Sequence, residues 1–196
     1  MSCIQYSMDK IKLQFFILTG EPGVGKTTLI KKVTSVLKEK NITTVGFYTE
    51  EVRKNRSRDG FDVVTLEGDR GRLARDMNFL NTQVKYKVGK YGVLIEEFEK
   101  VAIPCFETLQ MGKQSQLLVV DEIGKMEFFS TMFKEKIKEI VNSSTPMLAT
   151  IPIRKGDPLI EKIRNSNKAK IWVVTHENRD MALADIVNVI ETTIKS

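Results

Sequence analysis

The chain has 196 residues, a length that suits one domain over residues 1–196 with a hydrophobic core of its own. Its hydrophobic share of 41% and charged share of 29% are ordinary for a soluble globular protein, and no apolar run is long enough for a membrane helix. The net charge of +6 suits nucleic acid and a bound nucleotide equally, so charge alone does not choose between them.

The N-terminus and the cysteines indicate the cellular compartment. Residues 1–12 form an extension without a long apolar segment or a small-residue cleavage site, so we expect a cytoplasmic protein, with the nucleus left open. Cys3 and Cys105 stand far apart without CxxC spacing, which predicts neither a disulfide framework nor a zinc site. Apolar neighbours place Cys105 in the core and argue against a nucleophile.

The first predicted elements are a buried strand, a glycine-rich turn and a helix. The apolar run at 13–18 predicts the strand, and GEPGVGKT at 20–27 fits the phosphate-loop pattern without a mismatch. Apolar residues at helical spacing predict a helix over 26–40 that ends near Asn41. A glycine-rich turn without function is the alternative, but the strand, the helix and the Lys-Thr pair together favour a phosphate loop.

The chemistry of this loop predicts a site for a polyphosphate. Gly20, Gly23 and Gly25 leave the backbone free to curl around an anion, with its N–H groups pointing inward. Lys26 would bridge the outer phosphates and act in catalysis, and the Thr27 hydroxyl would bind Mg²⁺ beside the positive end of the helix. The predicted nucleotide contacts of this segment also include Glu21, Pro22, Val24 and Thr28.

The middle of the chain predicts antiparallel strands. Residues 44–52 and 61–66 have strand-like composition and flank a basic turn at 53–60, so they should pair as a hairpin. Residues 84–94, interrupted by two glycines, predict a further strand pair. We therefore expect an antiparallel insertion over 45–94 on an otherwise parallel core.

The second half alternates strands and helices. A helix is predicted over 96–111, where Pro104 should kink or interrupt it, and a buried strand over 116–120. Alternation of this kind implies a parallel sheet covered on both faces, with right-handed crossovers. The remaining expected elements are a helix over 126–141, a strand over 147–151, a helix over 157–165, a strand over 170–174 and a final amphipathic helix.

Asp121 and Glu122 end the buried strand and form the second chemical element. Ligands bind beyond the carboxyl ends of parallel strands, where Gly20 and Asp121 should both emerge. Asp121 is expected to hold Mg²⁺, through water or through Thr27, and Glu122 to act as the general base that activates a water molecule. The alternative is an acidic strand end that caps the next helix.

Asp121, Glu122 and the two residues after them also match a motif of GTPases. Residues 121–124 spell the Asp-x-x-Gly switch of GTPases. Guanine-specific GTPases carry a further Asn-Lys-x-Asp element after a later strand, whereas the sequence at 167–170 lacks the Asp and precedes its strand. We therefore do not expect dedicated GTP specificity, although GTP stays open as one of several substrates.

Several runs together resemble the cancer-related nucleoside-triphosphatase family and its microbial relatives. The resemblance extends from about Phe15 to the last helix, and its DEIGKME and GFYTEEVR runs are more specific than a phosphate loop alone. The runs are Gly20 to Thr28, GFYTEEVR at 46–53, GFDVVTL at 60–66, VVDEIGKMEFFS at 119–130, and Thr175 with Asn178 and Arg179.

This resemblance implies a RecA-like α/β P-loop NTPase and slow Mg²⁺-dependent hydrolysis of ATP, GTP, CTP and related triphosphates. Glu21 stands where the family often has proline, so its side chain should point to solvent or weaken phosphate binding slightly. The nucleotide-holding segments of the family carry over to Gly20 through Thr27 and to Leu118, Val119, Val120, Asp121, Glu122, Ile123, Gly124 and Lys125.

Other assignments rest on single residues. Arg179 is a candidate for contact with the base or a phosphate, with a surface ion pair as the alternative. Asn178 is a candidate cap of the last helix, and His176 a candidate for stacking on a base. The sequence does not say which arginine, if any, reaches the γ-phosphate as an arginine finger; the candidates are Arg53, Arg56, Arg58, Arg70, Arg72, Arg75 and Arg154.

These observations predict a monomeric, Mg²⁺-dependent nucleoside triphosphatase with broad base tolerance, because no base-reading motif is visible. Its expected partners are nucleoside triphosphates, without a membrane. Two alternatives stay open. One is a nucleotide or small-molecule kinase that uses the insertion or residues 154–157 as a lid. The other is a nucleotide-gated module whose basic turn at 53–58 binds nucleic acid.

Overall fold

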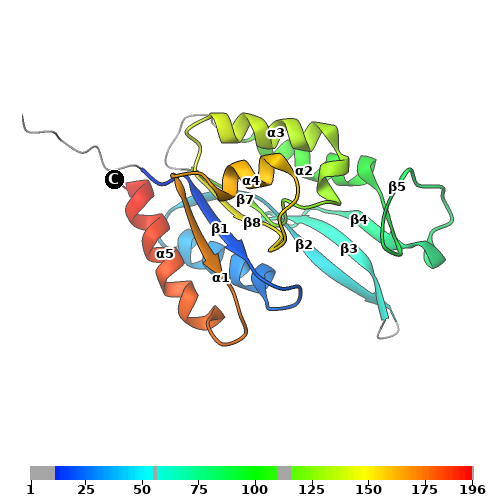
Figure 1. Ribbon diagram of the computed structural model, residues 1–196, viewed down its shortest axis with the longest axis horizontal. Helices are drawn as coiled ribbons and strands as arrows, with labels where there is room; N and C mark the ends of the chain where they lie inside the picture. Colours follow the sequence, from blue (N-terminus) through cyan, green and yellow to red (C-terminus); the bar gives the residue numbers. More distant parts are fainter. Residues whose placement is uncertain (1–11, 55–56, 110–115, 196) are drawn as a thin grey trace, which may run out of the picture.

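The computed structural model describes residues 12–54, 57–109 and 116–195 (Figure 1). They form one nine-stranded sheet with the strand order β5-β6-β4-β3-β2-β7-β8-β1-β9. The strands are β1 (Phe15–Thr19), β2 (Thr43–Lys54), β3 (Ser57–Thr65), β4 (Arg70–Asp76), β5 (Tyr86–Val88), β6 (Tyr91–Val93), β7 (Gln116–Val120), β8 (Met147–Thr150) and β9 (Ala169–Val173).

Five α-helices and two short 3₁₀ turns accompany the sheet. The 3₁₀ turns are η1 (Met77–Phe79) and η2 (Glu127–Phe129). None of the helices in the described part of the chain is both long and apolar enough to cross a membrane. The helices are α1 (Lys26–Glu39), α2 (Ile95–Glu107), α3 (Thr131–Asn142), α4 (Pro158–Arg164) and α5 (Arg179–Lys195).

The sheet has a parallel half and an antiparallel half that share β2. The first part of β2 runs parallel to β7, and its second part pairs antiparallel with β3. β4, β6 and β5 continue the antiparallel half, whereas β8, β1 and β9 continue the parallel half. The expected antiparallel insertion on a parallel core is therefore confirmed, and it extends the same sheet.

Alternate residues of the strands feed two hydrophobic cores on opposite faces. Phe15 and Ile17 of β1 point to the face covered by α2, α3 and α4, while Phe16 and Leu18 point to the face covered by α1 and α5. This alternation follows from the two-residue period of a β-strand. Figure 1 shows α1 beside α5, with the other three helices across the sheet.

The structure corrects two expectations for single elements and adds one strand. α3 begins at Thr131 and not at Met126, because the Ser130 hydroxyl accepts a hydrogen bond from the backbone N–H of Phe133 at 2.9 Å and so caps the helix. Pro104 does not interrupt α2, since it lies in the last turn and the helix ends three residues later, at Glu107. β4 was not expected.

Of the two cysteines, the structure describes Cys105. Cys105 is buried among apolar side chains of α2, as expected for a core residue, and burial raises the pKa of its thiol to about 12. A thiol with so high a pKa is a poor nucleophile at neutral pH. Cys3 and the N-terminal extension up to residue 11 lie outside the described residues.

Candidate active site

The phosphate loop connects the carboxyl end of β1 to α1. Gly23 and Gly25 adopt positive φ angles of 85° and 99°, which an L-residue with a side chain rarely adopts. Gly25 occupies the N-cap position of α1, and no side chain caps this helix. The first N–H groups of α1 are therefore left for another acceptor, as an anion-binding helix start requires.

Lys26 lies across the mouth of this loop. Its ammonium donates hydrogen bonds to the carbonyl oxygens of Gly20, at 2.9 Å, and Glu21, at 3.2 Å. The Glu21 side chain is exposed, which agrees with the expectation that it points to solvent. The loop thus holds a positive charge at the place where the sequence predicts the outer phosphates.

Asp121 emerges from β7 as a buried carboxylate. One oxygen, Oδ1, accepts a hydrogen bond of 2.5 Å from the Thr150 hydroxyl at the end of β8. Among the buried side-chain polar atoms of the described residues, Oδ2 of Asp121 is the one without a partner. A buried carboxylate oxygen without a hydrogen bond is costly, so this atom is suited to an ion.

Electrostatics show that Asp121 lies beside the phosphate loop. Burial raises the pKa of Asp121, and the hydrogen bond from Thr150 opposes this effect. Smaller lowering effects come from the Thr27 hydroxyl and from the charge of Lys26, which both belong to the loop. The structure therefore brings the first acid, the predicted metal-binding threonine and the loop lysine together.

Glu122 shares this environment. Burial raises its pKa first, the neighbouring charge of Asp121 raises it further, and the charge of Lys26 lowers it. A carboxylate whose pKa is moved toward neutrality is a better proton acceptor than an ordinary one. This placement suits the predicted general base, a role that stays a prediction.

Glu127 is a third carboxyl group of this region, and sequence reasoning assigned it no role. A Cβ atom on Gly124 would lie 2.9 Å from Oε2 of Glu127 and 3.0 Å from Oε1 of Glu122, so the two carboxyl groups meet over a residue without a side chain. Burial, followed by the charge of Glu122, raises the pKa of Glu127 to about 8. The only signal in the sequence was its position within the DEIGKME run.

Thr27 and Asp121 fit a magnesium ion. Both supply oxygen ligands, which Mg²⁺ prefers, and Oδ2 of Asp121 is buried without a hydrogen-bond partner. The described residues contain no cluster of three or more His, Cys, Asp or Glu side chains arranged to hold a metal. Mg²⁺ in phosphate-binding enzymes is commonly held by one or two protein groups and completed by phosphates and water.

Comparison with known proteins identifies the family. Residues 15–187 match the family model described as NTPase. The human cancer-related nucleoside-triphosphatase is 44% identical over 184 residues, which cover 91% of this chain and 97% of the relative. The chain belongs to this nucleoside-triphosphatase family. The nucleoside-triphosphatase THEP1 of Thermotoga maritima is 39% identical over 175 residues, or 89% of this chain and 94% of the relative.

Solved structures of the family agree with the fold of this NTPase. The crystal structure of THEP1 from Aquifex aeolicus has a TM-score of 0.78 at 38% identity and covers 90% of this chain and 99% of that chain. The solution structure of a human cancer-related nucleoside triphosphatase has a TM-score of 0.77 at 43% identity, with 91% and 98% covered. The expected P-loop NTPase fold of the α/β class is confirmed.

Arg179, at the start of α5, lies against the phosphate loop of the NTPase. Its Nη1 atom is 3.2 Å from the place where a Cβ on Gly25 would stand. Together with Thr28 and Lys32 it lines a cavity of about 250 Å³. The structure thus brings Arg179 to the predicted nucleotide site.

The structure gives less support to the roles predicted for Asn178 and His176, the neighbours of Arg179. The Asn178 side chain does not cap α5; its Oδ1 accepts from the Thr175 N–H at 2.9 Å, and its Nδ2 donates to the Val173 carbonyl at 2.8 Å. Asn178 is therefore used to shape the turn between β9 and α5. His176 is exposed in the same turn.

Most candidate arginine fingers of the NTPase already form ion pairs in the antiparallel half of the sheet. Arg154 is different, because it lies in the segment after β8 and lines a cavity together with Gly124. Arg56 lies outside the described residues. The pairs are Arg53 and Arg58 with Glu51, Arg70 with Glu50 and Asp62, Arg72 with Glu97, and Arg75 with Asp59 and Asp62.

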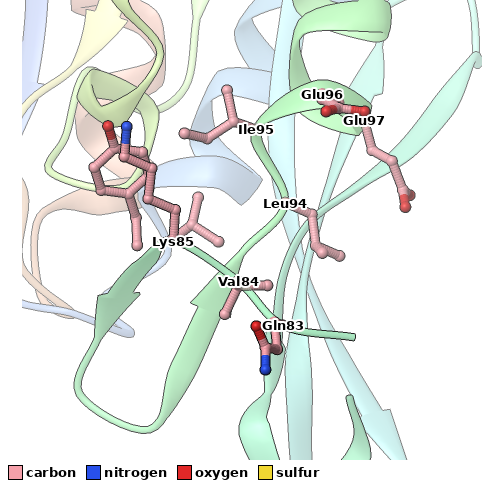
Figure 2. A pocket seen from close by; sticks show the side chains of 9 residues that line it. Gln83, Val84, Lys85, Leu94, Ile95, Glu96 and Glu97 are labelled. Carbon is pink, nitrogen blue, oxygen red and sulfur yellow. The ribbon is translucent and has the colours of Figure 1, made fainter. Parts of the chain in front are cut away.

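Another cavity, of about 470 Å³, lies in the antiparallel half of the sheet, between β5, β6 and the start of α2. Figure 2 shows Val84, Leu94 and Ile95 around it, with Glu96 and Glu97 at the beginning of the helix. β5 is the edge strand of this half, whereas β1 lies near the other edge of the sheet. This cavity therefore contains none of the predicted site residues.

Proposed function

We propose that this NTPase hydrolyses nucleoside triphosphates to the diphosphate and phosphate with the help of Mg²⁺. The observation that supports this proposal is the meeting of Lys26 and Thr27 from the phosphate loop with Asp121 from β7. This is the set of groups that positions a polyphosphate and its magnesium ion in phosphate-loop enzymes.

Each residue of the set has a distinct task. The N–H groups of the loop and the ammonium of Lys26 bind and neutralise the outer phosphates, while Thr27 and Asp121 hold Mg²⁺. The metal supplies charge that stabilises the transition state. Glu122 accepts a proton from a water molecule whose oxygen attacks the γ-phosphorus, and the bond from this phosphorus to the bridging oxygen breaks.

We further propose that the enzyme accepts several bases. The contacts that carry the proposal all involve phosphates, which are common to ATP, GTP, CTP and UTP. The turn that holds Asn178 and the side chain of Arg179 lie beyond the loop, where a base would meet exposed groups. Broad tolerance is therefore the expected result of binding that depends on phosphates.

The first prediction concerns Lys26 and Glu122. We expect Lys26→Ala to abolish nucleotide binding or turnover, because the phosphates lose their fixed cation. Glu122→Gln should bind MgATP but hydrolyse it about 10² to 10⁴ times more slowly, the usual contribution of a general base. Phosphate release from all four triphosphates, with Mg²⁺ and with EDTA, measures both effects.

Lys38→Ala is the matched control, since Lys38 is an exposed lysine at the far end of the same helix. It should keep the wild-type rate. Turnover at the wild-type rate by Glu122→Gln would show that this residue is not the general base. Hydrolysis that continues in EDTA would contradict the proposed dependence on Mg²⁺.

A kinase remains the second candidate, supported by the cavity that Arg154 and Gly124 share. A kinase transfers the γ-phosphoryl group to an acceptor, whereas a triphosphatase transfers it to water. Release of one phosphate per nucleotide consumed, in the absence of any acceptor, would argue against the kinase.

A further inference from the structure

A cavity of about 470 Å³ lies between the segments that follow β7 and β8, and we call it the Phe128 pocket after one of its residues. None of the residues that line it belongs to the phosphate loop. Its volume falls within the range of about 300 to 1,000 Å³ that is typical of small-molecule sites. The residues used below are Lys125, Phe128, Phe129, Arg154, Lys155 and Ile160.

One wall of the Phe128 pocket is apolar, and neighbouring aromatic side chains hold its rings in place. The ring of Phe128 contacts Phe133 of α3 with centroids 6.0 Å apart, and Phe129 stacks on Tyr86 of β5 at 4.6 Å. Ile160 of α4 completes the wall. The ammonium of Lys134 lies 5.0 Å from the centroid of the Phe128 ring, so one face of this ring is already occupied. Rings held by such contacts offer a preformed apolar surface to a ligand on their remaining faces.

The rim of the pocket carries positive charge without compensation. Lys125, Arg154 and Lys155 are exposed, and no hydrogen bond or ion pair joins them to any residue that the structure describes. The acidic residue of the lining, Asp157, is already occupied, because it binds Lys134 at 2.5 Å and caps α4. Three free cations beside an apolar wall suit an anionic group such as a phosphate.

The pocket also adjoins the proposed catalytic carboxylate. Gly124 lines the pocket, and a Cβ on this residue would lie 3.0 Å from Oε1 of Glu122. The loop after β8 follows Thr150, the last residue of that strand, whose hydroxyl donates a hydrogen bond to Asp121. Both segments leave the carboxyl ends of parallel strands, the edge at which ligands of such sheets bind.

We propose that the Phe128 pocket binds a second small molecule that combines a planar ring with a phosphate group, the chemistry of a nucleoside monophosphate. The ring packs on Phe128 and Phe129, and the phosphate contacts Lys125, Arg154 and Lys155. This site goes beyond the proposed hydrolysis, which requires the phosphate loop and the acidic pair but no second ligand.

The test is a calorimetric titration with AMP of protein whose phosphate loop is already saturated with Mg²⁺ and the non-hydrolysable β,γ-imido analogue of ATP. We expect one further equivalent of AMP to bind. The double variant Arg154→Glu, Lys155→Glu should weaken this binding by about tenfold or more, because two charged contacts to phosphate become repulsive. Both changes lie in an exposed segment, and the melting temperature of the variant checks its folding.

Lys38→Glu is the matched control and should bind AMP as the wild type does, since it changes an exposed lysine on another element. Lys26→Ala should lose hydrolysis but keep this AMP site, so the two proposals can fail separately. The proposal is overturned if loop-saturated protein binds no AMP or if the charge reversal leaves AMP binding unchanged. Displacement of AMP by an equal concentration of inorganic phosphate, or tighter binding of a single-stranded oligonucleotide, would also overturn it.

Discussion

Asp121, Glu122 and Glu127 place three carboxyl groups in one buried region. The pKa of each is raised, first by burial and then, for the two glutamates, by the charge of a neighbouring acid. Like charges at such close range do not all ionise together at neutral pH without a cation. Lys26 supplies part of that positive charge, and we expect Mg²⁺ to supply the rest.

The raised pKa of Glu127 should be measurable through the pH dependence of the stability of the ligand-free protein. Its pKa is about 8 in the folded protein, against an ordinary value of 4.5, so the folded state holds a proton that the unfolded state releases. The stabilisation of the folded state by this proton is complete below about pH 4.5 and is lost as the pH rises through 8. The free energy of unfolding should therefore fall between pH 5 and pH 8, by at most about 1.4 kcal/mol for each unit of pKa shift.

Glu127→Gln removes the titrating group with little change of shape. Urea denaturation in EDTA at several pH values should show a smaller decrease in the free energy of unfolding for this variant than for the wild type. Glu135→Gln, an exposed change on α3, should leave the slope as it is. An equal slope in all three proteins would mean that Glu127 does not bind the proton.

At the scale of elements, α3 is held to the sheet by a cluster of aromatic rings around Phe133. This side chain is fully buried and faces β2, α2 and the turn that carries Glu127. The cluster therefore links the helix to the segment that forms part of the candidate site. Ring centroids 5.3 to 6.0 Å from that of Phe133 belong to Phe47, Phe98, Phe106 and Phe128.

Phe133→Ala should lower the free energy of unfolding by about 3 to 5 kcal/mol, the usual cost of removing a buried phenylalanine and leaving a cavity. Chemical denaturation measures this loss. Met132→Ala, at a neighbouring position with 53% of its surface exposed, should change stability by about 0.5 kcal/mol or less. A cost below about 1 kcal/mol for Phe133→Ala would show that the cluster collapses around the gap.

At the scale of the whole molecule, the net charge of +6 gives little support to a nucleic-acid surface on the hairpin of β2 and β3. Two of its arginines, Arg53 and Arg58, pair with Glu51 on β2. Arg70 of β4 pairs with Glu50 and Asp62. These ion pairs reduce the charge that remains free to meet phosphates.

We therefore expect weak binding of single-stranded RNA that disappears between 50 and 200 mM salt, a range over which about 6 to 10 phosphate contacts would cost a factor of 10³ to 10⁵. Fluorescence anisotropy with a labelled oligonucleotide measures this binding. Hydrolysis of ATP over the same range serves as the control for folding. Submicromolar binding at 200 mM salt would support the nucleic-acid module instead.

The sequence by itself determined the phosphate loop and the buried strand that ends in Asp121. Both are local features, since eight consecutive residues supply the loop and a short apolar run supplies the strand. The alternation of strands and helices likewise predicted the parallel half of the sheet. β4 was missed because Arg70–Asp76 is rich in charge and becomes a strand only by pairing with β3 and β6.

Tertiary structure alone decided how distant residues meet. The approach of Glu127 to Glu122 depends on a 3₁₀ turn and on the missing side chain of Gly124. The contact of Arg179 with the loop joins residues more than 150 positions apart, and the Phe128 pocket forms where two strands end side by side. Such contacts are set by packing across the sheet, which local periodicity and residue spacing do not encode.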